Sequence, residues 1–212
     1  MIKALIFDLD NTLYDEKSYF LEVFRIFAKK YKLDFEFIKE LLSDDFFLKS
    51  KDIFGDVLKK IGCYSVAKQN ELFELYKTID CKLDLYSEAY KTFDFAIKKN
   101  ISLAIVTNGV LEAQKNKVKV LKLEKFTNCI IYAREFGKEY EKPHPLPFIK
   151  AIKCLKVNTS EAIYIGDHPF TDIKGAKKVG LKAIRFLNGY AKYIDYNYNL
   201  NIESLIEIKK FL

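Results

Sequence analysis

The sequence predicts an α/β fold with a predominantly parallel sheet and an all-helical insert, and two patterns support this prediction. From about residue 87 onward, short apolar runs alternate with stretches of helical periodicity, which is typical of strands joined by helical crossovers. Between residues 15 and 86 the hydrophobic spacing is helical and no strand-like alternation occurs. A chain of 212 residues that is 50% hydrophobic can bury a core and carry such an insertion.

The elements follow in chain order from an apolar run at residues 4–7, which is the first expected strand. Phe20, Phe24 and Phe27 then recur at helical spacing, which favours packing inside a helical bundle. Insert helices are expected at 18–32, 34–50, 52–61 and 65–78. Further strands are expected at 101–107, 129–133, 162–166 and 183–186, with helices at 87–99, 146–155, 171–179 and 202–211. We therefore divide the chain into a core domain, residues 1–14 and 87–212, and a helical domain, residues 15–86 (the insert).

Two carboxylates directly follow the first expected strand. Asp8 and Asp10 are two residues apart, so the side-chain period of a strand points them to the same side. Like charges placed in this way repel each other unless a cation, a shared proton or a reaction offsets the cost. A pair of solvated loop acids, or a helix cap, is the alternative for these two residues.

Three later segments also carry polar residues at strand ends or in a stiffened loop. They are Thr107-Asn108-Gly109 after one apolar run, Lys142 before a proline, and Asp167 and Asp172 after another run. In open parallel sheets, ligands bind at the carboxyl ends of the strands, so these segments are expected to converge on one crevice. Taken singly, Thr107 and Asp167 would be ordinary helix caps and Lys142 an ordinary surface lysine.

In their order along the chain, these segments resemble the four motifs of the haloacid dehalogenase superfamily of phosphohydrolases. Asp8, Asp10 and Thr12 match its DxDx(T/V) strand end, and the later motifs match at Thr107, at Lys142, and at Asp167 with Asp172. The resemblance covers residues 1–14 and 87–190. It implies a Rossmann-like core and makes residues 15–86 a cap of type one, a lid that excludes water and carries much of the specificity.

The resemblance and the residue chemistry together indicate a phosphatase. A phosphate monoester is anionic, so attack by a carboxylate requires positive charge around the phosphoryl group. Asp8 would be the nucleophile and form an aspartyl-phosphate. Asp10 would protonate the leaving alkoxide and then take a proton from the attacking water.

Binding of the phosphoryl group is assigned to the two middle motifs. Thr107 and the main-chain amides of Asn108 and Gly109 would donate hydrogen bonds to its oxygens, and Lys142 would supply a compact positive charge.

A magnesium ion is expected beside these groups, because Mg²⁺ prefers oxygen ligands and is usually held by one or two carboxylates with waters and substrate phosphate. Asp8, the main-chain carbonyl of Asp10, and Asp167 would serve as ligands. The family pattern gives Asp172 a supporting place, ligating through water or orienting Lys142.

The expected substrate is a small phosphomonoester of the nucleotide or sugar phosphate class. The Asp-Asn-Thr-Leu-Tyr form of the first motif looks like superfamily members acting on nucleoside monophosphates or on an acylneuraminate 9-phosphate. Superfamily dehalogenases lack the second aspartate, so Asp10 argues against carbon–halogen cleavage. A phosphomutase using the same aspartates, or a non-catalytic ligand-binding protein of this fold, remains the alternative.

The composition of the chain limits the kinds of partner that we expect. The formal charge is +7, but the lysines are spread along the chain in pairs typical of solvated helix faces, so no nucleic-acid partner is expected. No apolar stretch approaches membrane-spanning length, which favours a cytoplasmic protein without membrane contact. The sequence indicates no particular oligomeric state.

The cysteines and histidines carry no assigned chemistry. Cys63, Cys81, Cys129 and Cys154 are widely scattered and contain no CxxC pair, so we expect reduced thiols with no zinc site and no disulfide. His144 and His168 flank the expected catalytic groups, and loop packing is the interpretation preferred for each.

Overall fold

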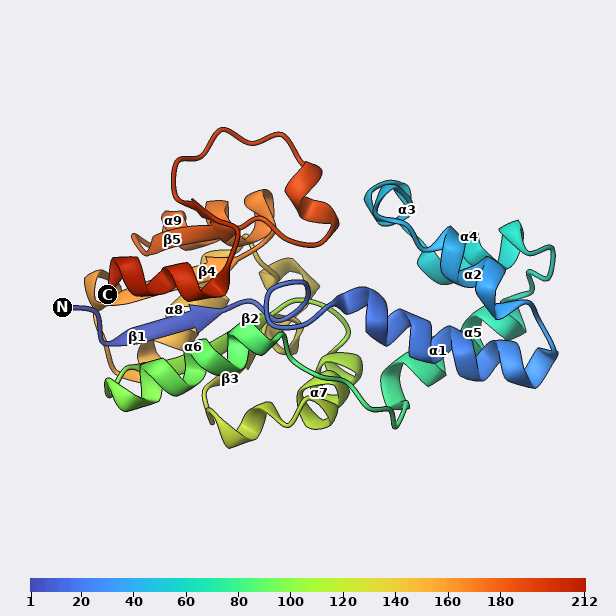
Figure 1. Ribbon diagram of the computed structural model, residues 1–212, viewed down its shortest axis with the longest axis horizontal. Coiled ribbons are helices and arrows are strands. Elements are labelled where there is room, and N and C mark those ends of the chain that lie inside the picture. Colours follow the sequence, from blue (N-terminus) through green and yellow to red (C-terminus); the bar gives the residue numbers. More distant parts are fainter.

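The computed structural model describes residues 1–212 and shows a six-stranded sheet with helices around it, beside a separate group of helices (Figure 1). The strand order is β3-β2-β1-β4-β5-β6, and every neighbouring pair is parallel. The strands are β1 (Ala4–Phe7), β2 (Ser102–Thr107), β3 (Ile130–Tyr132), β4 (Ala162–Gly166), β5 (Lys182–Phe186) and β6 (Asn201–Ile202). The predicted α/β class with a parallel sheet is confirmed.

The order of the strands places the end of β1 at the centre of the sheet. The chain builds outward through β2 and β3, then returns to β4 on the other side of β1. Phe7, the last residue of β1, is level with Ile105 in β2 and Ile165 in β4. Because the strand order reverses here, a crevice is expected beyond the carboxyl end of β1, where Asp8 follows.

Helices cover both faces of the sheet, and strand residues alternate between them as the period of two requires. On one face Phe93 of α6 packs edge-on against Phe7, with ring centroids 5.5 Å apart. On the other face Phe148 of α8 packs against Tyr164, at 4.9 Å. The helices of this part are α6 (Ser87–Lys98), α7 (Leu111–Val120), α8 (Pro145–Leu155) and α9 (Lys174–Lys178).

The insert is entirely helical and lies to the right of the sheet in Figure 1. Its helices are α1 (Glu16–Tyr31), α2 (Phe35–Leu41), α3 (Asp44–Lys49), α4 (Ile53–Lys60) and α5 (Val66–Thr78). Phe20, Phe24 and Phe27 are buried, as predicted for bundle residues. The single helix expected at 34–50 was wrong: Ser43 accepts a hydrogen bond from the Phe46 amide and starts α3 as a new helix.

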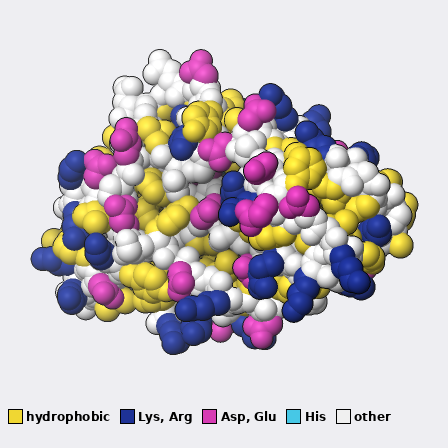
Figure 2. Space-filling model, turned by 45° about the vertical axis from the view of Figure 1, so that its right-hand side comes forward, with side chains coloured by type: hydrophobic (Ala, Val, Ile, Leu, Met, Phe, Trp, Pro, Cys, Tyr) yellow, Lys and Arg dark blue, Asp and Glu magenta, His cyan; other side chains and the backbone are white.

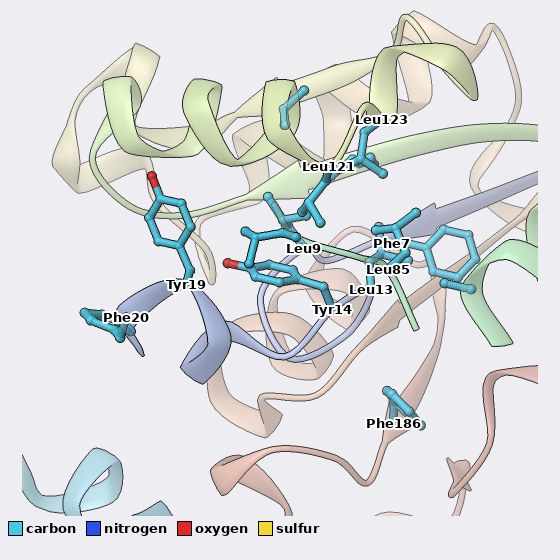
Figure 3. Close-up of a cluster of buried hydrophobic side chains, with 14 of the residues drawn as sticks. Phe7, Leu9, Leu13, Tyr14, Tyr19, Phe20, Leu85, Leu121, Leu123 and Phe186 are labelled. Atoms are coloured by element: carbon cyan, nitrogen blue, oxygen red, sulfur yellow. The ribbon is translucent and has the colours of Figure 1, made fainter. Parts of the chain in front are cut away.

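The chain enters and leaves the insert at adjacent points. The Tyr86 amide donates to the Leu13 carbonyl, 2.9 Å away, so the two crossings lie side by side. Around them, Phe7, Leu9, Leu13 and Leu85 gather in one buried apolar group (Figure 3). This group belongs to a continuous cluster of 38 buried residues that extends from the sheet into the insert. Apolar packing therefore ties the base of the insert to the core.

Two expected helices near the C-terminus differ in the structure. The helix expected at 171–179 begins as a π-helical turn, Pro169–Ile173, because the His168 side chain accepts from the amides of Phe170 and Thr171 and sets its start. The helix expected at 202–211 is present but begins at Leu205 and is of the 3-10 type. The chain forms β6, and then Ser204 and Glu207 make a capping box that begins a 3-10 helix, Leu205–Phe211.

The expectation of four reduced cysteines was wrong for two of them. Cys129 and Cys154 form a disulfide, with Cα atoms 6.0 Å apart. The two positions are 25 residues apart in sequence and meet only because α8 packs beside β3, so their spacing gave no sign of pairing. Cys63 and Cys81 are free. None of the helices combines the length and the apolar character that crossing a membrane requires.

Candidate active site

The loop after β1 is a tight turn that holds two of the expected acids. Asn11 adopts a left-handed backbone conformation, with φ of 58°, and this reverses the chain directly after Asp10. The Thr12 hydroxyl, fully buried, donates to Asp8 Oδ2 at 3.4 Å. Thr12 therefore supports the first aspartate from behind.

Lys142 is buried against the end of β1, although lysine is usually a surface residue. Its Nζ contacts the Asp8 carboxylate and donates to Asp172 Oδ1 at 2.6 Å. It also donates to the Tyr164 hydroxyl at 3.2 Å and to the Val106 carbonyl at 3.1 Å. Burial alone would lower the pKa of Lys142, but the carboxylates of Asp172 and Asp8 outweigh burial and raise it. The amine therefore stays charged beside Asp8.

Three buried carboxylates converge at the same point. Asp8, Asp167 and Asp172 each offer an oxygen, and these oxygens lie within 4.8 Å of one another. Burial raises the pKa of Asp8 to about 8, against the opposing effect of Lys142. Burial and the nearby Asp8 charge raise the pKa of Asp167 well above its usual range. The cluster is thus short of positive charge, even with Lys142 in place.

Asp167 is the member of this cluster whose carboxylate makes no hydrogen bond or ion pair within the chain, while its side chain faces the cavity. Its oxygens are reached from the cavity, so a cation bound there could pair with this carboxylate. Hard oxygen donors without nitrogen or sulfur ligands suit Mg²⁺. The donor set therefore fits the expected magnesium ion, for which Asp8 and Asp167 would be the carboxylate ligands.

The segment after β2 is tied to the loop that carries Lys142. The Asn108 side chain accepts from the Lys142 amide at 2.8 Å and donates to the Lys142 carbonyl at 3.0 Å. Gly109, with φ of 115°, directs its amide to Glu141 Oε1 at 2.7 Å. An amide expected to bind a phosphoryl oxygen is thus already held by an anion. Thr107 is 1% exposed, and its hydroxyl lies 3.2 Å from Gln114 Oε1.

Asp10 sits in a different environment from Asp8. Its Oδ1 accepts from Lys117 Nζ at 2.7 Å and from the Tyr14 hydroxyl at 2.6 Å, and its Oδ2 accepts from Gln114 at 3.1 Å. Lys117 also reaches Glu16 Oε1 at 3.3 Å. Burial and the Asp10 charge raise the pKa of Glu16 to about 7.

These groups open onto a polar cavity of about 320 Å³ lined by 16 residues, of which only Tyr76 and Tyr190 are hydrophobic. All the predicted site residues except Thr12 and Thr107 line it. Figure 2 shows acidic side chains near the middle of one face, with lysines and arginines scattered around them. Basic side chains on that face are interspersed with acidic ones and do not gather in a single patch.

Several residues in or behind the cavity wall were not predicted from sequence: Gln114 lines the cavity, and Lys117 is buried behind it against Asp10. Gln114 and Lys117 lie three residues apart on α7, the helix that follows the second motif, and this spacing puts both on one helix face. That signal was available in the sequence. Arg134 and Glu141, which form a two-point ion pair at 2.9 and 3.1 Å, come from an irregular loop that gave no comparable pattern.

The two histidines have different positions. His144 begins α8, where its Nδ1 accepts from the Leu146 amide, and its ring packs edge-on against Tyr140. This is loop packing. His168 lines the cavity, although its Nδ1 is taken up by the amides of the π-helical turn. Burial lowers its pKa, so the ring is neutral near pH 7.

Comparison with known proteins places this site in a family. Residues 5–186 match the model of the haloacid dehalogenase-like hydrolases. A glyceraldehyde 3-phosphate phosphatase of Methanocaldococcus jannaschii is 30% identical, over 100% of this chain and 99% of that protein. An N-acylneuraminate-9-phosphatase of Mus musculus is 27% identical, over 88% of this chain and 83% of its own length. The chain belongs to the haloacid dehalogenase-like hydrolases, which confirms the resemblance of its motifs.

Solved structures agree on the fold. A magnesium-bound HAD-hydrolase, YfnB of Bacillus subtilis, superposes with a TM-score of 0.72 at 18% identity, covering 99% of this chain and 98% of that one. An HAD phosphatase of Thermococcus onnurineus gives a TM-score of 0.63 at 26% identity, over 99% and 97% of the two chains. The protein is therefore a hydrolase with the Rossmann-like core of this family.

Proposed function

We propose that this hydrolase cleaves small phosphoric monoesters with the help of Mg²⁺, through an aspartyl-phosphate on Asp8. The observation that carries the proposal is the setting of Asp8. Its carboxylate lies at the cavity wall, in contact with Lys142 and within 4.8 Å of oxygens of Asp167 and Asp172. Such a setting neutralises a phosphoryl group and brings it to a carboxylate nucleophile.

The reaction would proceed in two displacements. In the first, an Asp8 oxygen forms a bond to phosphorus while the bond from phosphorus to the alkoxide breaks, and Asp10 transfers a proton to that alkoxide to give the alcohol. In the second, water attacks phosphorus and gives a proton to Asp10. The bond between phosphorus and Asp8 breaks, which releases inorganic phosphate and restores both carboxyl groups.

Mg²⁺, when bound, would offset the negative charge of the phosphoryl group and of the acidic cluster. Asp8, Asp167 and the Asp10 carbonyl are the proposed ligands. Asp172 lies within reach of the same point, but its Oδ1 holds Lys142 and its Oδ2 accepts from the His168 amide at 3.1 Å. We therefore assign Asp172 to the orientation of Lys142.

The cavity favours a short, polar substrate. Its volume of about 320 Å³ is near the lower end of the range for small-molecule sites. Its wall offers hydrogen-bonding groups and only two hydrophobic side chains. Four relatives that act, by name, on glyceraldehyde 3-phosphate are 28 to 31% identical to this chain. We propose triose and other small sugar phosphates as the first substrates to test, ahead of nucleotides.

The insert is proposed to serve as the cap. Glu16 at the start of α1 and Tyr76 in α5 line the cavity together with residues of the core. Movement of the insert would therefore open or close the site and change the substrate's contacts at the same time.

The test is phosphate release from a panel of triose, sugar and nucleoside phosphates, with Mg²⁺ or with a chelator, using Asp8→Asn as the control. Magnesium-dependent release that is lost in the control is expected. If Asp8→Asn and the parent protein released phosphate at equal rates, Asp8 would not be the nucleophile. Transfer of the phosphoryl group to a second position of a sugar phosphate, without release of phosphate, would indicate a phosphomutase instead.

A further inference from the structure

Lys117 is a fully buried lysine that the proposed reaction does not use. It projects from α7, 10 residues after Thr107, and its Nζ lies 2.7 Å from Asp10 Oδ1. We propose that Lys117 is a positioning residue that fixes the Asp10 carboxyl group toward the leaving group, and that the insert completes its setting. This inference rests on the proposed function, because it assigns Lys117 a role through Asp10.

The hydrogen bonds of Asp10 leave its carboxyl group one orientation. Oδ1 accepts from both Lys117 and Tyr14, and Oδ2 accepts from Gln114 alone. Oδ2 therefore keeps acceptor capacity for exchange of a proton with the substrate oxygen. Because a general acid must lie within hydrogen-bond reach of its target, rotation of this carboxyl group would lower the rate without removing the group.

The insert supplies an ion pair and two aromatic contacts to Lys117. Its Nζ lies 3.3 Å from Glu16 Oε1 and over the rings of Tyr19 and Tyr76, at 5.3 and 5.1 Å from their centroids. Both kinds of contact attract an ammonium group. With Asp10 on the core side, the lysine bridges the two parts of the chain.

The neighbouring residue strengthens this bridge. The Asn116 side chain donates to the Tyr19 hydroxyl at 2.9 Å and to the Ile79 carbonyl at 2.7 Å. Figure 3 shows Tyr19 on α1 with its hydroxyl directed toward α7. Docking of the insert and placement of Asp10 thus depend on one stretch of α7.

Stability alone is a weak reason to keep a lysine here. Buried ion pairs often contribute little to stability, because removing both charges from water offsets their attraction. An apolar side chain of similar length would fill the same space between Tyr19 and Tyr76. What it would not supply is the donor that orients Asp10.

The test compares kcat/KM of Lys117→Met on an alkyl phosphate, such as glycerol phosphate, and on p-nitrophenyl phosphate. The p-nitrophenolate leaves without a proton, so transfer of the phosphoryl group from this ester to Asp8 does not need the acid. We expect a loss of about 10- to 100-fold on the alkyl ester, below the roughly 10²- to 10⁴-fold lost when the acid itself is removed, and of less than about threefold on the aryl ester. The exposed neighbour Lys119, changed to Met, is the matched control.

A merely structural role would lower both kcat/KM values by the same factor, and that result would overturn the proposal. A second comparison covers the case in which Lys117→Met fails to fold. Asp10→Asn with Lys117→Met removes both charges together, so the double variant does not carry the unpaired Asp10 carboxylate that Lys117→Met alone would leave. If Lys117 acts through Asp10, the double variant loses no more on the alkyl ester than Asp10→Asn does. An additional loss would contradict it.

The proposed phosphatase function and the proposed role of Lys117 would be contradicted by different results. If the parent protein releases phosphate from neither ester, the proposed function fails. If the parent is active and Asp10→Asn spares the aryl ester, but Lys117→Met lowers both esters equally, only the role of Lys117 fails.

Discussion

Asp8 and Asp10 are two residues apart, yet their surroundings give them different chemistry. Asp8 is 6% exposed and lies among Lys142 and two further carboxylates, an arrangement suited to a nucleophile beside a cation. Asp10 lies among neutral donors and Lys117, an arrangement that orients it. The spacing of the two acids predicted that both reach the site. It did not predict these partners, most of which, such as Gln114, Lys117 and Lys142, lie more than 100 positions away in sequence.

Arg134 is expected to support substrate binding. Its guanidinium lines the cavity and neutralises Glu141, whose carboxylate would otherwise repel a phosphate. Changing Arg134 to Met should raise KM by about tenfold, which corresponds to roughly 1.4 kcal/mol of lost charge-assisted hydrogen bonding. The rise in KM is measured by steady-state kinetics on the best substrate, and Lys138→Met in the same loop is the control. An unchanged KM would show that this pair does not affect binding.

At the scale of elements, α9 and the Lys142 loop are fitted closely together. A Cβ added at Gly175 would lie 2.6 Å from ring carbons of Phe148 and 3.0 Å from the Pro143 Cα. Pro143 directly follows Lys142, so a shift there would move the lysine. The absence of a side chain at Gly175 thus helps to place a residue of the site.

Gly175→Ala should therefore destabilise the protein and lower its activity. The gain in helix propensity, about 0.5–1 kcal/mol, is smaller than the 1–3 kcal/mol usual for overpacking a buried contact. Thermal unfolding and kcat/KM measure the two effects. Lys174→Ala, an exposed position on the same helix, is the control. A variant that is more stable than the parent would contradict the close packing.

The insert and the core also meet across the mouth of the site. Phe47 of α3 stacks on Tyr190, with ring centroids 5.6 Å apart and planes 6° from parallel, and Tyr190 lines the cavity. Phe47→Leu keeps an apolar contact but loses the aromatic pair, which is worth about 0.5–1.5 kcal/mol. If the insert closes over substrate, KM should rise by about 2- to 12-fold, with a smaller change in kcat.

Leu48→Ala is the control for this change, because Leu48 is the next residue of α3 and is 40% exposed. Equal kinetics of Phe47→Leu and the parent protein would mean that this stack does not hold the insert over the site.

For the whole molecule, the buried acids make stability depend on pH and on cation. The pKa of Asp8 is raised from 3.8 to about 8. Between these pH values the folded protein keeps protons that the unfolded chain has released, so the free energy of unfolding falls as pH rises. Asp167, whose pKa is also raised, acts in the same direction. A divalent cation bound to the carboxylates should oppose this loss.

We expect Mg²⁺ to raise the melting temperature more at pH 8 than at pH 5, compared with chelator at the same pH. Asp167→Asn should reduce both the loss of stability at high pH and the effect of Mg²⁺. Differential scanning calorimetry measures these values. An effect of Mg²⁺ that is the same at both pH values, or that survives unchanged in the variant, would argue against a cation at the acidic cluster.

The sequence predicted the features that depend on local interactions and missed those that depend on contacts between distant residues. The apolar runs that became β1, β2 and β4 predicted the strands and the polar residues at their ends, because strand period and burial are local. The break at Ser43 and the short strand β6 depend on capping and on a neighbouring strand, so periodicity did not predict them. The Cys129–Cys154 disulfide and the Arg134–Glu141 pair depend on tertiary contacts alone.

The most direct test of the account is to trap the covalent intermediate. The parent protein, mixed with Mg²⁺ and a rapidly cleaved phosphomonoester, is quenched in acid within a turnover and digested, and the peptide containing Asp8 is examined by mass spectrometry. We predict that this peptide carries one phosphoryl group, which is removed by hydroxylamine and absent in Asp8→Asn. The account would be contradicted if the parent protein released phosphate without any phosphorylated Asp8 peptide and the Asp8→Asn protein were as active as the parent.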